Sequence, residues 1–365
     1  MRESKKTIKV KFVGFWWWDS TNDSTFTYEY TYLMRILRKH YNVVVDEKNP
    51  DFVIYSLWES DIELYDAVRI FYSGENCSGS LMQADYIIDF DDYEYMDRHL
   101  WLPNYFFFEE YADSITEGMK KKHLVADEML KKKNAFCSLT SSHETDMRLS
   151  ILKELSKYKH VDCPGSVGHN IDIPNGSFAV VDFESKHKFS VAFEHHSRAD
   201  YITEKIVQSF AACTVPVYWG AANVDKYFNP EAMVIIKDED DIPSAIERIK
   251  AIDNDDELYL HMLKQPAILP GMEEKFENAI PNLEKFLCNI FDQESEEAIR
   301  RGTHTHNNYM PKKSDEIFYI EKKANYLKSR LYADSFKAKS ALAIIKWLTK
   351  RDIKKNKQEK KDDNR

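Results

Sequence analysis

The residues best suited to chemistry lie in one stretch, residues 188–236. A short apolar run ends in Glu194, a polar loop follows, and Thr203, Glu204 and Lys205 precede a segment of helical character. With Thr203 as the N-cap, Glu204 and Lys205 fall in the first helical turn. A lysine there opposes the helix dipole unless an anion is bound, so the free amides and the ammonium predict a diphosphate site. The alternative is two solvated charges at a helix start.

A second apolar run, residues 215–220, closes this stretch. A strand–loop–helix–strand of this length is a βαβ unit, which requires a parallel sheet. In such a sheet the loops beyond the carboxyl ends of the strands form the ligand crevice. We therefore expect Glu194 and Lys205 to lie at that crevice.

The same stretch resembles the donor-binding motif of the family 10 glycosyltransferases, the α1,3/4-fucosyltransferases, and especially of their bacterial members. The matching residues are Phe189, Phe193, Glu194, Tyr201, Thr203, Glu204, Lys205, Val215, Pro216 and Gly220. Family members usually carry Asn directly after the Glu, whereas this chain has His195. A neutral imidazole donates or accepts a hydrogen bond but does not do both from one atom pair, so the role of position 195 is left open.

A second acid, Glu75, follows a strand-like run that ends at Gly74. The phrase FYSGEN resembles a segment of the bacterial fucosyltransferases whose Glu is the proposed general base. The resemblance gives this role to Glu75 and places Tyr72 beside the donor. An inverting transfer needs one carboxylate to deprotonate the acceptor hydroxyl as that oxygen attacks the anomeric carbon. A structural acid in a turn is the alternative.

Arg148 lies at the start of a helix expected at 147–158. The resembled family has an Arg at the start of the corresponding helix, which clamps the donor diphosphate. A guanidinium fits two phosphate oxygens at once and stays charged while the leaving group gains charge. The alternative is an exposed helix arginine that pairs with Asp146 or Glu144.

Three consecutive tryptophans, Trp16, Trp17 and Trp18, follow a strand expected at 9–15. Three adjacent side chains cannot all face one core from a regular element, so at least one is expected to be exposed. Sugar faces pack on such rings, and we therefore expect these residues to bind the acceptor. A bulky hinge or interdomain contact is the alternative.

Asp89-Phe90-Asp91 offers a competing interpretation. In another glycosyltransferase fold a D-x-D after a strand binds Mn²⁺ across a nucleotide diphosphate. The surrounding segment is acidic throughout, so the pattern arises easily from composition. We therefore predict substrate-site lining or a solvated edge, no metal ligands, and no required cofactor, with a divalent metal at most stimulatory.

The whole chain of 365 residues has a net charge of −10, which argues against nucleic-acid binding, and it lacks a G-x-G-x-x-G pattern. Its five scattered cysteines and the lack of a long apolar run predict a cytoplasmic protein, and the resemblance to the bacterial family members implies a bacterial one. The apolar stripe and lysines after residue 338 predict a basic amphipathic helix that binds an anionic membrane surface at the inner face of the cytoplasmic membrane. The alternative is a soluble, partly disordered basic tail that does not bind a membrane.

The predicted fold class is α/β, a GT-B arrangement of two Rossmann-like domains. We expect an acceptor-binding domain at 1–130 and a GDP-fucose-binding domain at 131–293. The polar segment 111–133 is the expected linker, and a terminal helix at 273–292, divided near Pro281, is expected to cross back to the first domain. A charged extension with the basic helix fills 294–365.

The resemblance implies an inverting α1,3-fucosyltransferase that moves L-fucose from GDP-fucose to an N-acetylglucosamine or glucose residue, as in N-acetyllactosamine or lactose, for Lewis-type or lipopolysaccharide O-antigen synthesis. It implies that Arg148 and Lys205 hold the diphosphate and that Glu204 and Tyr201 contact the nucleoside. Glu194 and His195 would lie near the fucose or the acceptor. Two alternatives are a metal-dependent D-x-D glycosyltransferase that uses another nucleotide sugar and a non-catalytic glycan-binding protein.

Overall fold

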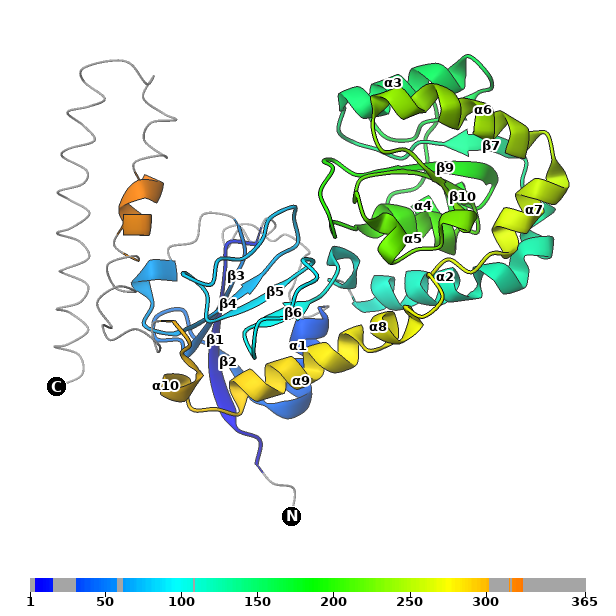
Figure 1. Cartoon of the computed structure of the whole chain (residues 1–365). Helices are drawn as coiled ribbons and strands as arrows, with labels where there is room; N and C mark the ends of the chain where they lie inside the picture. The colour runs from blue at the N-terminus through cyan, green and yellow to red at the C-terminus, as the bar shows by residue number, and fades with distance from the viewer. Residues whose placement is uncertain are drawn as a thin grey trace, which may run out of the picture.

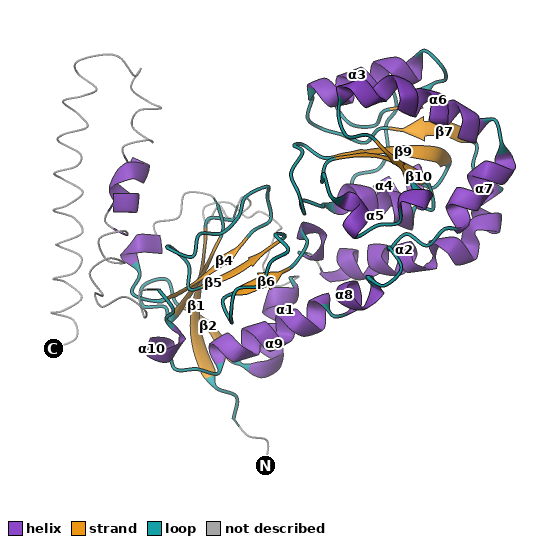
Figure 2. Ribbon diagram, viewed as in Figure 1, coloured by secondary structure: helices purple, strands orange, loops and turns teal. Residues whose placement is uncertain are grey.

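The computed structural model describes residues 4–15, 31–57, 62–107, 109–301, 315 and 317–323. Two separate β-sheets organise this part of the chain, one in each half, with helices packed against them (Figure 1). Figure 2 shows the same view with the strands of both sheets in orange. Every strand pair in both sheets is parallel, so the predicted α/β fold with two Rossmann-like sheets is confirmed.

The first sheet has the strand order β2-β1-β3-β4-β5-β6. Its strands are β1 (Thr7–Val13), β2 (Asn42–Val45), β3 (Phe52–Tyr55), β4 (Val68–Tyr72), β5 (Tyr86–Asp89) and β6 (His99–Trp101). Every residue of β3, β4 and β5 is buried, as expected for parallel strands that are covered on both faces. Helix α1 (Tyr32–His40) begins where the Thr31 hydroxyl accepts from the amide of Met34.

The second sheet has the order β11-β10-β9-β7-β8. Its strands are β7 (Ala135–Ser138), β8 (Val161–Asp162), β9 (His187–Phe193), β10 (Val215–Trp219) and β11 (Val234–Ile235). The helices around it are α3 (Asp146–Ser156), α4 (Ser177–Glu184), α5 (Glu204–Ala211), α6 (Ile242–Asp253) and α7 (Asp256–Lys264). Helices α3 and α6 cover one face, and α4 and α5 cover the other (Figure 1).

The segment expected as a linker forms a helix, α2 (Glu109–Leu130), between β6 of the first sheet and β7 of the second. The helix packs against α5 and α7, and its apolar residues Ala112, Ile115 and Met119 are buried. Lys122 is also buried, and its ammonium donates to three carbonyls at the end of α7, at 2.8–3.1 Å. Carbonyls at a helix end lack intrahelical partners, which explains why a charged sequence forms a packed helix here.

The predicted return to the first sheet is confirmed. Residues 273–291 form two helices, α8 (Glu273–Glu277) and α9 (Ala279–Phe291), with Pro281 in the first turn of α9, where its missing amide costs nothing. Helix α9 runs alongside α1 (Figure 1), and the ring of Phe291 lies 4.4 Å from that of Phe52. A short helix, α10 (Ser295–Ala298), follows.

Beyond α10 the chain is held to the first sheet by buried charges. Asp85 accepts from the amides of Arg300 and Arg301, at 2.8 and 2.7 Å. The guanidinium of Arg69, which is fully buried, donates to both carboxylate oxygens of Asp315. A charged extension therefore begins on the first sheet and not on the second.

Two predicted features lie outside the described residues: the tryptophans at 16–18 and the basic segment after residue 338. Among the helices that the structure describes, none combines the length and the apolar character that a membrane span requires.

Candidate functional site

The candidate residues of the second half cluster where its sheet reverses strand order. Strand β7 lies between β8 and β9, so the chain winds in opposite directions from this point. In open α/β sheets, ligands bind beyond the carboxyl ends of the strands at such a reversal. The loop after β7 leads to Arg148, and the loop after β9 begins with Glu194 and ends at α5.

Glu194 and Lys205 are tied together through Thr203. Glu194 is fully buried and accepts from the amide and the hydroxyl of Thr203, at 2.9 and 2.7 Å. The ammonium of Lys205 lies 3.3 Å from Glu194 Oε2 and 3.0 Å from Glu204 Oε1. Thr203 occupies the predicted N-cap position of α5, but its hydroxyl binds Glu194 and does not cap the helix.

Burial and charge act in opposite directions in this cluster. Burial raises the pKa of Glu194, and the nearby Lys205 partly opposes that rise. Burial works against the charge of Lys205, but attraction to Glu204 and Glu194 outweighs it and raises the pKa of Lys205 above its ordinary value. The ammonium is therefore charged at neutral pH and held at the amino end of α5, where it can meet a phosphate.

Gly220, directly after β10, makes room for this arrangement. A Cβ atom at this position would lie 2.4 Å from Cγ of Glu194. No heavy atom can approach so closely, so any larger residue would displace the buried carboxylate. The glycine at the end of the VPVYWG run is therefore explained by packing against Glu194.

Arg148 is buried, so the alternative of an exposed arginine is wrong. Its guanidinium donates to the carbonyls of His143 and Phe193, at 2.7 and 2.6 Å, and so joins the loop after β7 to the end of β9. Its Nε is buried and has no hydrogen-bond partner within the described ranges. Burial lowers the pKa of Arg148, and attraction to Glu194 and Glu204 opposes that shift.

Glu75 comes from the first half of the chain, in the turn after β4. The hydroxyl of Ser73 donates to the carbonyls of Glu75 and Cys77, both at 2.8 Å, and Asn104 donates to the carbonyl of Gly74. The Glu75 carboxylate itself has no hydrogen-bond partner among the residues that the structure describes. The turn is thus fixed by its backbone, and the acid is left available.

Burial raises the pKa of Glu75, and the negative charge of Glu204 raises it further. Lys205 and His143 act in the other direction. All three of these neighbours belong to the second half of the chain. The structure therefore brings an unpartnered acid from the first sheet within electrostatic reach of the Lys205 cluster of the second.

The other predicted site residues differ in exposure. His195 is exposed, and its ring lies 4.4 Å from that of His196 and 6.0 Å from that of His143. Tyr201 is buried, and its ring meets that of Phe90 edge-on at 5.1 Å. Tyr72 is buried in the core of the first half with its ring 5.2 Å from that of Phe107, so packing accounts for it without a ligand.

The D-x-D residues are engaged by protein groups. Asp89 is fully buried, accepts from the amides of Gly79 and Asp91, and lies 2.8 Å from Nε2 of His99. Asp91 is paired with Arg198 from the second half. Within the described part of the chain, no group of three His, Cys, Asp or Glu side chains is placed to hold a metal ion. Asp89 therefore holds the loops of the first half together, and Asp91 joins the two halves, roles that sequence reasoning missed.

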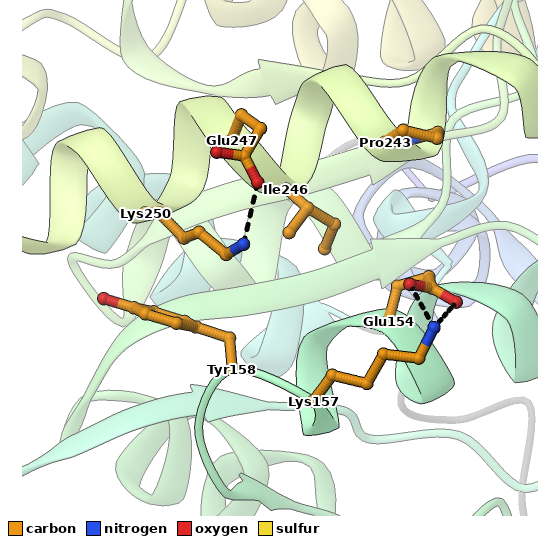
Figure 3. Close-up of a pocket in the computed structure, with 7 residues that line it drawn as sticks. All are labelled: Glu154, Lys157, Tyr158, Pro243, Ile246, Glu247 and Lys250. Carbon is orange, nitrogen blue, oxygen red and sulfur yellow. Dashed lines mark hydrogen bonds and ion pairs between the residues drawn. The ribbon is translucent and has the colours of Figure 1, made fainter.

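A hollow of about 330 Å³ lies between α3 and α6, away from all of these residues (Figure 3). Its charged side chains pair with each other, Lys157 with Glu154 and Lys250 with Glu247. It contains none of the candidate site residues.

Comparison with known proteins gives two family matches. Residues 129–302 match the model of the glycosyltransferase family 10 (fucosyltransferase) C-terminal region, and residues 10–108 match the N-terminal domain of alpha-(1,3)-fucosyltransferase FucT. The two matches together include every candidate site residue named above.

Individual relatives agree with these matches. The chain is 31% identical over 228 residues to "Alpha-(1,3)-fucosyltransferase FucT" of Helicobacter pylori, which covers 54% of this chain and 46% of that protein. It is 30% identical over 185 residues to "GDP-fucose protein O-fucosyltransferase 3" of Xenopus tropicalis. That alignment covers 46% of this chain and 38% of the relative. The chain thus spans less than half the length of these curated relatives.

A crystal structure of an alpha1,3-fucosyltransferase with GDP-fucose has a similar fold. The TM-score is 0.64 at 24% identity, covering 84% of this chain and 95% of that one. The likeness supports the GT-B-like arrangement of the two sheets.

Proposed function

Because the chain belongs to glycosyltransferase family 10, we propose that it is an inverting α1,3-fucosyltransferase that transfers L-fucose from GDP-fucose to a glycan. The observation that carries the proposal is the pairing of two unlike sites. An unpartnered acid, Glu75, lies within electrostatic reach of the ionic cluster of Lys205, Glu194 and Glu204 at the strand reversal of the second sheet.

In the proposed reaction Glu75 removes the proton from the acceptor hydroxyl. The hydroxyl oxygen forms a bond to the anomeric carbon as the bond from that carbon to the diphosphate oxygen breaks, and GDP leaves with the electron pair. One base suffices, because inversion needs no covalent sugar intermediate. Burial of Glu75 raises its pKa toward neutrality, which makes it a stronger base than an ordinary carboxylate.

The leaving diphosphate gains negative charge during this step. The ammonium of Lys205 and the amino end of α5 are placed to stabilise it, and they are already fixed by Glu194 and Thr203. Arg148 adds a second positive charge and holds the loops after β7 and β9 together. Glu204, which keeps part of its side chain exposed, would accept from a hydroxyl of the ribose. These cations do the work that a metal does in D-x-D enzymes.

The acceptor is proposed to be an N-acetylglucosamine or glucose residue of a glycan such as N-acetyllactosamine or lactose. Trp16, Trp17 and Trp18 stay candidates for its binding. A Lewis-type or lipopolysaccharide pathway and a cytoplasmic location also stay predictions. The name of the Xenopus relative specifies a protein acceptor, so the experiment must also test a protein or peptide acceptor.

The test is GDP release from GDP-fucose, measured with and without N-acetyllactosamine, lactose or an unfolded peptide acceptor, and repeated in EDTA. We expect turnover that depends on a glycan acceptor and survives EDTA, with GDP-mannose as the inactive donor control. Turnover abolished by EDTA would favour a metal-dependent transferase, and glycan binding without turnover would favour a non-catalytic binder. Nuclear magnetic resonance of the product would establish the linkage.

A further inference from the structure

Arg198 lies in the loop between β9 and α5, between Glu194 and Lys205 in the sequence. Its guanidinium nevertheless contacts the first half of the chain. Nη2 donates to both carboxylate oxygens of Asp91, at 2.8 and 2.9 Å, and to the hydroxyl of Ser78. Nη1 lies 3.4 Å from Oδ1 of Asn76. The guanidinium carbon also lies 4.8 Å from the centre of the Phe90 ring.

Asn76 and Ser78 belong to the turn that carries Glu75. This turn is stiffened from within by Ser73, and its far end is fixed where the amide of Gly79 donates to Asp89 at 3.0 Å. Ser78 also donates to Asp91, so Arg198, Ser78 and Asp91 form a closed set of hydrogen bonds. Any movement of Arg198 relative to this turn would break several bonds at once.

Two further contacts hold the same loop. Asp200, with a φ of 62°, accepts from the amide of Asp92 and from the hydroxyl of Tyr227. Tyr201 packs against Phe90. The loop that leads to Lys205 is therefore docked on residues 90–92 of the first half along its length.

We propose that Arg198, together with Asp91, Asn76 and Ser78, is a latch that fixes the base-bearing turn against the donor-binding loop. Arg198 is a positioning residue for the transfer, and this inference rests on the proposed function. Exposed ion pairs contribute little, but these contacts act together. Nη2 meets both oxygens of Asp91 and the hydroxyl of Ser78, Nη1 lies near Asn76, and the guanidinium lies over the Phe90 ring, so the set fixes a geometry. A lysine ammonium can meet Asp91, but it has no second nitrogen to reach Asn76 and no planar group to lie over Phe90.

The latch acts on the distance between Glu75 and the donor and not on the donor site itself. Lys205 is held by Glu194, Thr203 and Glu204, all from the second half. Loss of Arg198 should therefore leave GDP binding nearly intact while the base is no longer fixed. A misplacement of about 1 Å between reacting groups can cost on the order of 100-fold in rate.

The experiment compares Arg198→Ala with Arg198→Lys, Asp91→Asn and the double variant Arg198→Ala/Asp91→Asn. Arg248→Ala, an exposed arginine of α6, is the matched control. For Arg198→Ala we expect kcat for transfer to fall by about 10- to 100-fold, with the Kd for GDP within about threefold by calorimetry. Arg198→Lys should recover part of the loss, and the double variant should be no worse than Arg198→Ala because the two residues act as one unit.

Three results would overturn the latch: unchanged kcat in Arg198→Ala, a parallel loss of GDP affinity, or additive effects in the double variant. If Arg198→Ala does not fold, the same criteria apply to Asp91→Asn, which keeps the side-chain volume. A wild-type protein that binds GDP but transfers no fucose would refute the proposed function instead. The latch would then be judged by thermal unfolding, where non-additive Tm shifts of the same variants support it and additive shifts refute it.

Discussion

The turn after β4 and the loop after β9 each carry a glutamate, and the hydrogen bonding of the two carboxylates is opposite. In the turn, hydrogen bonds from Ser73 and Asn104 satisfy the backbone and leave the carboxylate of Glu75 without a partner among the described residues. In the loop, Glu194 is fully buried and each of its oxygens accepts from Thr203 or meets Lys205. Burial raises the pKa of both acids, so what separates them is hydrogen bonding: Glu75 keeps free lone pairs for a proton, whereas those of Glu194 are engaged.

This difference explains how the two sheets divide the reaction. The second sheet holds a preorganised ionic cluster at its strand reversal, which suits a donor that must be bound before the chemistry begins. In the proposed reaction the first sheet supplies the base and, through Asp91, a contact to the loop that leads to Lys205. The predictions below test whether the two regions can be separated in this way.

Among changes to the donor-binding half, Lys205→Ala should have the largest effect. It removes the ammonium that is placed to meet the diphosphate and leaves the buried Glu194 without a cation. We expect transfer to fall by about 10²–10³-fold, with a weaker Kd for GDP, measured by steady-state kinetics and calorimetry. Lys237→Ala, at an exposed lysine of the same half, should change neither quantity, and intact GDP affinity in Lys205→Ala would contradict the anchor role.

Gly220→Ala should damage the anchor without touching a charge. The added Cβ would lie 2.4 Å from Glu194, so the carboxylate must move away from Thr203. We expect the free energy of unfolding to fall by about 1–3 kcal/mol, together with weaker GDP binding. Denaturant unfolding that matches the wild type would show that Glu194 has room that the structure does not reveal.

Glu184→Gln should separate stability from reactivity. Glu184 at the end of α4 is buried, its Oε2 has no hydrogen-bond partner in the described ranges, and burial raises its pKa to about 7. Because the folded pKa lies above the unfolded value of 4.5, the stability from the neutral carboxyl is present below pH 4.5 and lost as the pH rises through about 7.

The wild type should therefore lose stability relative to Glu184→Gln between these pH values, by on the order of 1–3 kcal/mol. Denaturant unfolding at pH 4.5 and pH 8 measures the difference. Transfer at pH 8 should change little, because the groups that act on Glu184 include Ser190 and Thr140 and none of the proposed base or diphosphate residues. Parallel pH curves for the two proteins would refute this account of Glu184.

His195→Asn should have the smallest effect. The side chain is exposed and has no hydrogen-bond partner among the described residues, and the resemblance described above implies Asn at this position. We expect kcat/KM to change by no more than about threefold, the range of an ordinary surface substitution, with His196→Asn as the control. A loss of tenfold or more would assign His195 a direct contact with the fucose or the acceptor.

Much of the division of base and anchor between the two sheets could be predicted from the sequence. The apolar runs before Glu194 and Glu75 predicted buried parallel strands, and the strand–loop–helix–strand pattern predicted where the acids would lie. The motif also predicted that Thr203, Glu204 and Lys205 would stand at a helix start. Local sequence determines these features, so local reasoning was sufficient.

The features that the sequence did not predict depend on contacts between residues that are not neighbours in the chain. Helix α2 was hidden because lysines such as Lys122 are bound by carbonyls of α7, far away in the sequence. The role of Asp89 and Asp91 was hidden because His99 and Arg198, which bind them, are not near neighbours in the chain. No single-sequence pattern indicates which distant residue will meet a given charge.

The most direct test of the central claim is to measure transfer and GDP affinity side by side for Glu75→Gln. Glutamine keeps the shape of the side chain but cannot accept the proton. We predict that kcat falls by about 10²–10⁴-fold while the Kd for GDP stays within about twofold, with Glu94→Gln, at an exposed acid of the same half, unchanged in both. Wild-type transfer by Glu75→Gln, or a loss of GDP affinity as large as the loss of rate, would contradict the division of base and anchor between the two sheets.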